Sequence, residues 1–208
     1  MRNLNGVVET NSREVPFTLL KQEESSNTLG VVLPGSGYTT QAPLLYYSTG
    51  ALLSKGFDVV HVNYKYSNEE LPSLNENEFT HLIMSVIDHI LTENKYSDFY
   101  IVGKSLGTIA MPYLLKNPIL HQAKAIWLTP LLTRDDIYES LLTSKNKGIC
   151  IIGDKDPFYI PERFESIKNN PNLNSELIPN VNHSLEIEKF RINSVEVIKD
   201  IINKIEKL

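Results

Sequence analysis

The sequence has few features that cross-link a chain or anchor it in a membrane. It contains one cysteine, Cys150, so an internal disulfide is excluded. No run of eighteen apolar residues occurs, and the polar opening at residues 1–5 has no apolar stretch behind it. Neither a membrane span nor a signal peptide is therefore expected. These absences predict a cytoplasmic protein with no membrane partner.

Basic clusters and cofactor motifs are also missing. The chain has 20 Lys and Arg residues against 25 Asp and Glu, a formal net charge of -5, and nowhere do basic residues cluster into a face. Nucleic acid is therefore not an expected partner. The run Gly103-Lys104-Ser105 also ends a phosphate-binding P-loop, but that motif needs a glycine where Asp98 stands. No metal-ligand spacing or nucleotide fingerprint appears, so neither a metal nor a cofactor is expected.

Length and composition limit the domain organisation. The chain has 208 residues, of which 41% are hydrophobic, which is enough for one domain with a full core over residues 1–208. A second domain of ordinary size has no room. The function is expected to lie within this one fold.

The rest of the chain is organised around the stretch 98–108. Its first half, 99–102, is aromatic and β-branched, which favours a buried strand, and apolar residues then recur at helical spacing. Ser105 lies at the junction, in the pattern Gly-x-Ser-x-Gly formed with Gly103 and Gly107. A strand that turns into a helix this sharply needs small residues on both sides and exposes the serine hydroxyl. A glycine-rich turn without chemistry is the alternative interpretation of the pentapeptide.

Apolar patterning predicts eight strands alternating with helices. Pro16 is expected to keep the second strand at a sheet edge, and Pro112 to kink the helix that follows Ser105. The alternation indicates a mostly parallel sheet with helices on both faces, led by an antiparallel hairpin with a polar turn at 10–14. The predicted strands are 6–9, 15–21, 29–33, 57–64, 99–102, 123–129, 148–153 and 175–178. The predicted helices include 79–91, 135–142, 161–167 and 186–208.

The residues 101–108 resemble the nucleophile elbow of the α/β-hydrolase family, and the order of strands and helices extends the resemblance over nearly the whole chain. The resemblance implies an eight-stranded α/β-hydrolase sheet and identifies Ser105 as the nucleophile of a serine hydrolase. Ligands of such sheets bind at the carboxyl ends of the strands. Only residues that directly follow a strand are therefore candidates for the site.

A serine nucleophile needs a base, and five histidines are available. His183 follows the last predicted strand and precedes the last helix, where the family that the chain resembles places its histidine. The others are interpreted as surface or packed residues, because they lie within a strand, on a helix or before a strand. These four residues are His61, His81, His89 and His121.

The acid is expected after the strand 148–153. Asp156 matches the family's spacing of a glycine, two residues and an aspartate, and Asp154 is the second choice. Turn aspartates before proline are common, so both also have a structural interpretation. Asp135 and Asp136 follow a strand too, but the start of a short helix explains them. The chain order serine, aspartate, histidine is the order expected of this fold.

The oxyanion formed in acyl transfer needs fixed donors. One is expected from the backbone N–H of Leu106, and the other from the loop 34–37, which resembles the family's His-Gly-x-Gly loop with proline in place of histidine. Ser36 is preferred there, with Gly37 or Tyr38 as alternatives. Lys104 is expected at the surface, as a possible partner for an anionic substrate group.

The sequence therefore predicts a serine hydrolase that cleaves a small carboxylic ester or thioester through an acyl-enzyme. A peptidase or an acyltransferase would use the same three residues, and so would a ligand sensor that turns over slowly or not at all. Only 130–147 separates two predicted strands where relatives insert a lid, so no cap domain is expected. Ile137 and Leu141 are expected to face the pocket, and an open site with modest apolar walls predicts a preference for short acyl groups.

Overall fold

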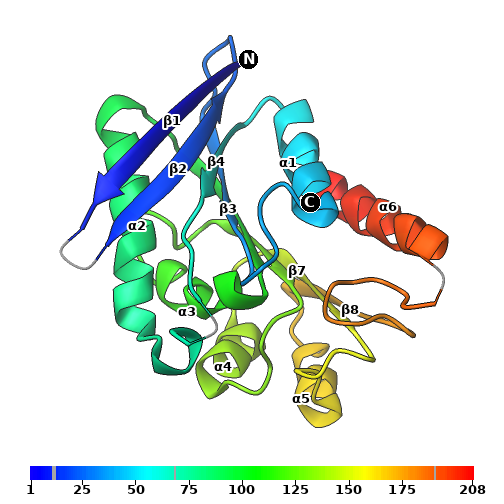
Figure 1. Ribbon diagram of the computed structural model, residues 1–208. Helices are drawn as coiled ribbons and strands as arrows, with labels where there is room; N and C mark the ends of the chain where they lie inside the picture. The colour runs from blue at the N-terminus through cyan, green and yellow to red at the C-terminus, as the bar shows by residue number, and fades with distance from the viewer. Residues whose placement is uncertain (11–12, 68, 190) are drawn as a thin grey trace.

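The computed structural model describes residues 1–10, 13–67, 69–189 and 191–208. In this part of the chain, eight strands form one sheet in the order β1-β2-β4-β3-β5-β6-β7-β8. The strands β1, β2 and β4 pair antiparallel, and every other pair is parallel (Figure 1). Their bounds are β1 Arg2–Glu9, β2 Glu14–Lys21, β3 Thr28–Leu33, β4 Asp58–Val62, β5 Asp98–Lys104, β6 Lys124–Leu128, β7 Gly148–Gly153 and β8 Leu173–Ile178.

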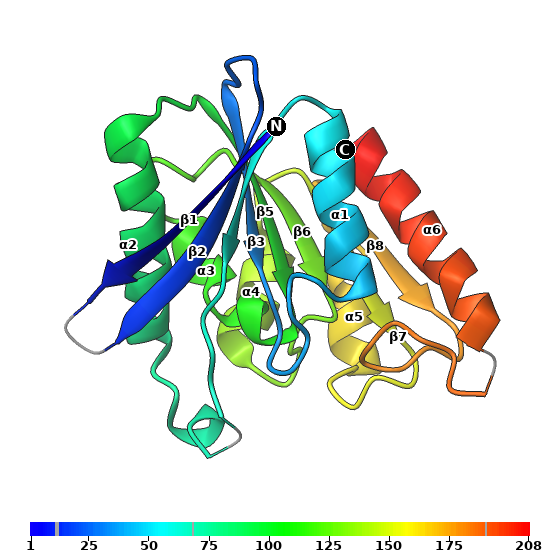
Figure 2. The same ribbon diagram turned by 45° about the horizontal axis from the view of Figure 1, so that its top comes forward.

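Helices cover both faces of the sheet. The helices α1 and α6 lie side by side on one face, and α2, α3, α4 and α5 cover the other, as Figures 1 and 2 show. Their bounds are α1 Pro43–Ser54, α2 Glu76–Glu93, α3 Met111–Leu114, α4 Asp135–Thr143, α5 Pro161–Ile167 and α6 Arg191–Lys207. The predicted fold class, a mostly parallel eight-stranded sheet with an N-terminal antiparallel hairpin, is confirmed.

Local sequence explains the clearest helix. Apolar residues at spacings of three and four give α2 one buried face, which includes Phe79, Ile83 and Ile90. The side chain of Asn75 caps its start by accepting the N–H groups of Asn77 and Glu78, each at 3.0 Å. Among the described residues, no helix is both long enough and apolar enough to cross a bilayer.

Several predicted elements differ from the structure at their ends, and some predicted positions are not described. Residues 11 and 12 of the predicted turn, and residue 190 of the helix predicted over 186–208, lie outside the described residues. The described part of that helix is α6, which begins at Arg191. Strand β1 is longer than expected and begins at Arg2. Its first four residues are exposed on both faces, so they lack the apolar and polar alternation that marks a half-buried strand.

The prediction for Pro16 was wrong, because β2 lies between β1 and β4 and is not an edge strand. The pairing of β2 with β4 begins at Phe17, and the carbonyl of Pro16 accepts the N–H of Asn63 at 2.8 Å, just past the end of β4. Proline has no N–H to donate, but at this position only the end of the hydrogen-bond ladder between β2 and β4 lacks that donor.

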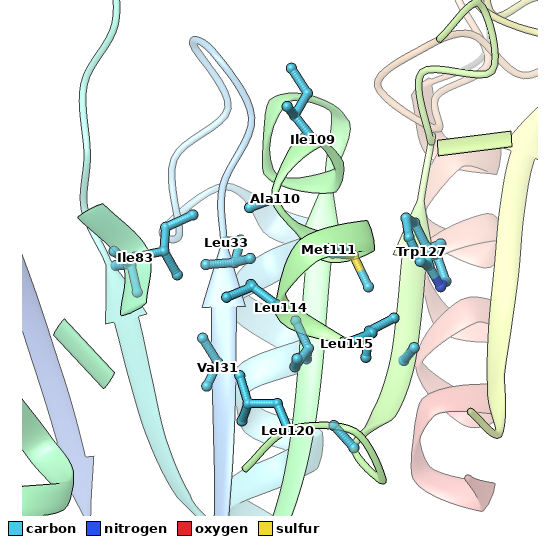
Figure 3. Packing of buried hydrophobic residues seen from close by; sticks show 14 of the residues in the cluster. Val31, Leu33, Ile83, Ile109, Ala110, Met111, Leu114, Leu115, Leu120 and Trp127 are labelled. Atoms are coloured by element: carbon cyan, nitrogen blue, oxygen red, sulfur yellow. The ribbon is translucent and has the colours of Figure 1, made fainter. Parts of the chain in front are cut away.

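The prediction for Pro112 was also wrong. The segment after β5 is a short 3₁₀-helix, Ser105–Ile109, followed by α3, with Pro112 in the first turn of α3. A proline there lacks only an N–H that would have no helical partner, so the kink and its cost of about 3 kcal/mol do not arise. Figure 3 shows Met111 and Leu114 of this segment packed among residues of β3, α2 and β6.

The connection between β6 and β7 contains α4 and no cap domain. Ile137 and Leu141 of α4 are fully buried in the core beneath the sheet, so the prediction that they face the pocket was wrong. Their spacing of four residues fits a helix face that packs on a core, and the sequence pattern alone does not say which side that face meets.

Candidate active site

The site lies where the order of the sheet reverses. Strands β3 and β5 are neighbours, but the chain leaves β3 for α1 on one face and leaves β5 for α3 on the other. Connections that part to opposite faces open a crevice at the carboxyl ends of the two strands. Ser36 follows β3 at this crevice, and Ser105 follows β5.

Ser105 has the strained backbone of a sharp strand-to-helix turn. Its φ is +49°, in the left-handed region that non-glycine residues rarely adopt. The turn brings Gly107 against the backbone of Leu33 and Gly103 against the side chain of Met111, so a Cβ at either glycine would collide with its neighbour. The two glycines of the motif are therefore required by close approach, and the serine hydroxyl is held at the end of β5.

His183 reaches Ser105 from the loop between β8 and α6. Its Nε2 atom lies 2.8 Å from Ser105 Oγ. The loop is held by Asn182, whose side-chain oxygen accepts the N–H groups of Ser184 and Glu186 at 2.9 and 3.1 Å. The ring of Phe158 packs against the imidazole with centroids 5.0 Å apart. The imidazole is therefore fixed on two sides while it faces the serine.

Asp156 contacts the other nitrogen of the same ring. Its Oδ2 lies 2.8 Å from His183 Nδ1, the carboxylate is fully buried, and Oδ1 accepts the N–H of Phe158 at 2.9 Å. Asp154 is engaged elsewhere, because its Oδ1 accepts the N–H of Asn180 at 2.6 Å. The structure thus brings Ser105, His183 and Asp156 into one hydrogen-bonded chain.

The other candidate aspartates and histidines lie outside this hydrogen-bonded chain of three residues. Asp136 is held by the guanidinium of Arg134 at 2.8 and 3.0 Å, and Asp135 pairs with Arg163. His61 is buried and bonds Thr49 at 2.8 Å through Nε2. His81 and His89 are exposed on α2, and His121 is exposed beyond α3.

The two expected oxyanion donors lie on the same cavity. Ser36 and Leu106 both line it, and a Cβ on Gly35 would lie 3.3 Å from the Cβ of Ser105, so the loop after β3 runs against the serine. Leu106 follows Ser105 in the first turn of the 3₁₀-helix, where a backbone N–H has no helical partner. Of the alternatives, Tyr38 donates its N–H to Gly35 O at 3.4 Å and is already engaged.

Lys104 is buried, contrary to the sequence prediction, with only 1% of its surface exposed. Its Nζ donates to the carbonyl oxygen of His183 at 3.1 Å and to Thr129 Oγ1 at 3.3 Å, and it lies 4.4 Å from the centre of the Tyr38 ring. Burial lowers the pKa of Lys104 to about 8, while the carboxylates of Asp156 and Glu186 oppose that change. The expected partner of an anionic substrate is thus a buried cation that holds the histidine loop.

The sequence analysis missed polar residues at the carboxyl end of β4 as well as the position of Lys104. His61 and Asn63 line the cavity beside Ser36. The rule that ligands bind at carboxyl ends of strands points to the end of β4 too, and it would have found them. Among the described residues, no group of three or more His, Cys, Asp or Glu side chains is arranged to hold a metal ion.

Comparison with known proteins gives a family and a set of similar folds. The family model for the alpha/beta hydrolase domain matches residues 28–207. No curated protein sequence matches the chain. An alpha-beta serine hydrolase homologue from Coxiella burnetii is 13% identical, with a TM-score of 0.72 over 98% of each chain.

Two further solved structures have the same fold. Est1E from Butyrivibrio proteoclasticus is 12% identical with a TM-score of 0.69, over 98% of this chain and 99% of that one. A serine hydrolase without lid from Xanthomonas campestris is 15% identical with a TM-score of 0.64, over 95% of this chain and 94% of that one. At such low identity these likenesses show the fold alone.

Proposed function

The chain belongs to the alpha/beta hydrolase domain family, and on that premise we propose that it is a serine hydrolase that cleaves a small carboxylic ester or thioester through an acyl-enzyme. The observation that carries the proposal is the hydrogen-bonded chain from Ser105 through His183 to Asp156, with 2.8 Å at each step. A hydroxyl, an imidazole and a buried carboxylate in this order are the parts of a nucleophile, a base and its orienting acid.

In the first half of the reaction, Ser105 Oγ bonds to the substrate carbonyl carbon and gives its proton to His183 Nε2. Asp156 accepts a hydrogen bond from Nδ1–H of His183, which keeps that proton on Nδ1 and leaves Nε2 unprotonated and able to act as the base. The negative charge that develops on the carbonyl oxygen is met by the N–H groups of Ser36 and Leu106. Collapse of this intermediate expels the alkoxide or thiolate, which takes the proton from Nε2, and the acyl group stays on Ser105.

In the second half, water attacks the acyl-enzyme. His183 removes a proton from the water as its oxygen bonds to the acyl carbon, and the same proton returns to Ser105 Oγ when the carboxylic acid leaves. Lys104 acts here through position alone. It holds the carbonyl of His183 and does not touch the reacting atoms.

Further observations support a serine hydrolase and, through a similar fold, an esterase. The positive φ of Ser105 and the crowding at Gly103 and Gly107 are features of a nucleophile elbow. Est1E, which has the same fold, has also been solved with ferulic acid bound. We further propose that the chain forms one domain that acts in the cytoplasm, on the basis of its length and its lone cysteine.

The test is covalent labelling followed by turnover. A fluorophosphonate probe should modify Ser105 in the wild-type protein, as located by peptide mass spectrometry, and should leave Ser105→Ala unmodified. A panel of p-nitrophenyl esters and acyl thioesters then measures hydrolysis. Labelling without turnover would favour a ligand sensor built on the same site, and no labelling of Ser105 would refute the proposed nucleophile.

A further inference from the structure

A cavity of about 580 Å³ lies beside Leu106, the residue that follows the serine, and its described lining includes no residue of the histidine loop. Ser36 and Leu106 are among its lining residues, and most of the others come from the loop 34–41 and from the carboxyl end of β4 and the residues after it. Its lining includes three polar side chains from different strands and loops, namely Thr18, Thr40 and Asn63. The wall is thus built from residues far apart in the sequence.

The wall carries a connected set of uncharged hydrogen-bonding groups. Thr40 Oγ1 donates to Asn63 Oδ1 at 3.2 Å, and Asn63 Nδ2 donates to Thr18 Oγ1 at 3.4 Å. Thr40 is only 3% exposed. These groups are held in place by one another, and each keeps unused capacity for a ligand, because an amide or hydroxyl can make more bonds than these.

His61 adds an imidazole to the same wall. It is 4% exposed, and its Nε2 is taken by Thr49, so Nδ1 is the ring nitrogen that remains for a ligand. Burial lowers the pKa of His61 to about 4, so the ring is neutral at pH 7. Lys65, the charged residue of the lining, is exposed to solvent. The cavity therefore presents uncharged hydrogen-bonding groups within a lining that is apolar over most of its area.

The position of the cavity indicates which part of the substrate enters it. The leaving oxygen must lie within reach of His183 Nε2 to take the proton. The described lining residues come from 18 to 66 and from Leu106, and none comes from the loops that carry Asp156 or His183. Both proposed oxyanion donors, Ser36 and Leu106, line it. The acyl group therefore points into the cavity and the leaving group points away from it.

We propose that this cavity selects acyl groups that carry a hydroxyl near the carbonyl, as in a 3-hydroxyacyl ester, over hydrocarbon acyl groups of the same shape. This inference rests on the proposed esterase function and names its substrate class. A hydrocarbon chain would cover Thr40, Asn63 and His61 without replacing their bonds to water, whereas a hydroxyl both donates and accepts. Sites that hydrogen-bond a substrate hydroxyl discriminate against analogues that lack it.

The test uses two esters with one leaving group. The p-nitrophenyl esters of 3-hydroxybutanoic acid and 3-methylbutanoic acid differ by a hydroxyl in place of a methyl group. The ratio of their kcat/KM values is measured for the wild type and for Asn63→Leu and Thr40→Val. Comparing ratios between proteins cancels the difference in intrinsic reactivity. We expect the ratio to fall at least tenfold in Asn63→Leu and at least threefold in Thr40→Val.

Two controls separate the cavity from general damage. Thr40→Ser keeps the hydroxyl and should keep the ratio, and Thr143→Val, at an exposed position on α4, should change neither the ratio nor the rates. An unchanged ratio in both cavity variants would overturn the proposal. Loss of hydrolysis of the 3-methylbutanoate alone in those variants would overturn it as well.

A second measurement does not depend on turnover. Binding of the two free acids to Ser105→Ala is followed by NMR titration of backbone amides. We expect 3-hydroxybutanoate to bind at least fivefold more tightly, with the largest shifts at residues 34–41 and 61–66. Equal affinities would overturn the inference even if neither ester is hydrolysed, and hydrolysis of both esters independent of Ser105 would instead refute the proposed function.

Discussion

Replacing Lys104 with methionine separates the cost of burying a cation from its use in the site. The ammonium group of Lys104 is buried and is bonded to the carbonyl of His183 and to the hydroxyl of Thr129. Methionine has similar length and no charge. We expect the variant to lose activity without losing stability at pH 7. The buried charge lowers the stability of the fold, whereas its hydrogen bond to the carbonyl of His183 supports activity.

The magnitude follows from the pKa of the buried amine. Its fall from 10.5 to about 8 corresponds to a cost of about 3 kcal/mol for keeping Lys104 charged in the folded state, at about 1.4 kcal/mol for each pH unit. Methionine removes that cost and also removes two hydrogen bonds, each with a net contribution of about 1 kcal/mol. The free energy of unfolding of Lys104→Met should therefore exceed that of the wild type by about 1 kcal/mol at pH 7.

The difference should reverse at alkaline pH. The unfolded chain keeps the Lys104 proton up to pH 10.5, whereas the folded chain loses it near pH 8. Between these values the unfolded state binds one more proton, so this group makes the folded wild type more stable as pH rises, by about 1.4 kcal/mol per pH unit. Below pH 8 the full cost is present, and Lys104→Met lacks this pH dependence.

Urea unfolding of both proteins at pH 7, 8, 9 and 10 measures the difference between their free energies of unfolding. The titration of all other groups cancels in this difference. The exposed Lys145→Met is the control and should follow the wild type at each pH. On p-nitrophenyl acetate, kcat/KM should fall about tenfold or more in Lys104→Met, because the carbonyl of His183 loses its charged donor. A stability difference that is constant from pH 7 to 10 would refute the reasoning about the buried charge.

Three further predictions concern the acid, the elbow and substrate length. Asp156→Asn should lower kcat by about 10⁴ through loss of the correct imidazole tautomer, while Asp154→Asn should have a far smaller effect, and the reverse order of effects would contradict the assignment. Gly107→Ala should lower the free energy of unfolding by about 1–3 kcal/mol, because its Cβ would collide with the Leu33 backbone. The control is Gly50→Ala on α1, where a Cβ meets nothing within 4 Å, and it should raise the free energy of unfolding by about 0.5–1 kcal/mol. Across p-nitrophenyl esters from two to sixteen carbons, kcat/KM should be highest for short acyl groups, since no cap domain covers the serine, and a maximum at ten carbons or longer would count against an open site.

The sheet and its order could be predicted because they depend on strong local signals. Short β-branched runs such as 148–153 are buried on both faces, and their ends in glycine or proline mark where each strand stops. The position of His183 after the last strand follows from the same count of elements. The rest of the site geometry depends on which loops meet, and the order of strands along the sheet is what brings β3 beside β5.

The wrong predictions share a physical cause. Each concerns a residue whose surroundings depend on how the chain packs in three dimensions and not on its neighbours in the sequence. Lysine has a strong preference for the surface, but Lys104 ends a buried strand and its long side chain reaches the carbonyl of His183 across the site. Pro112 resembles a helix breaker because the apolar spacing continues through it, whereas the structure has two helical segments there and Pro112 lies in the first turn of the second. Contacts between residues that are not neighbours in the sequence cannot be read from the local pattern of apolar residues.

The central claim is that Ser105 forms the acyl-enzyme, and one variant tests it most directly. The measurement is kcat/KM of Ser105→Ala on p-nitrophenyl acetate, together with its thermal melting temperature. The account predicts that hydrolysis falls by several orders of magnitude, because the attacking hydroxyl is gone and only the catalysis supplied by the oxyanion donors and binding remains. The melting temperature should stay within a few degrees of the wild type. Hydrolysis at more than about a tenth of the wild-type rate by the purified variant would contradict it.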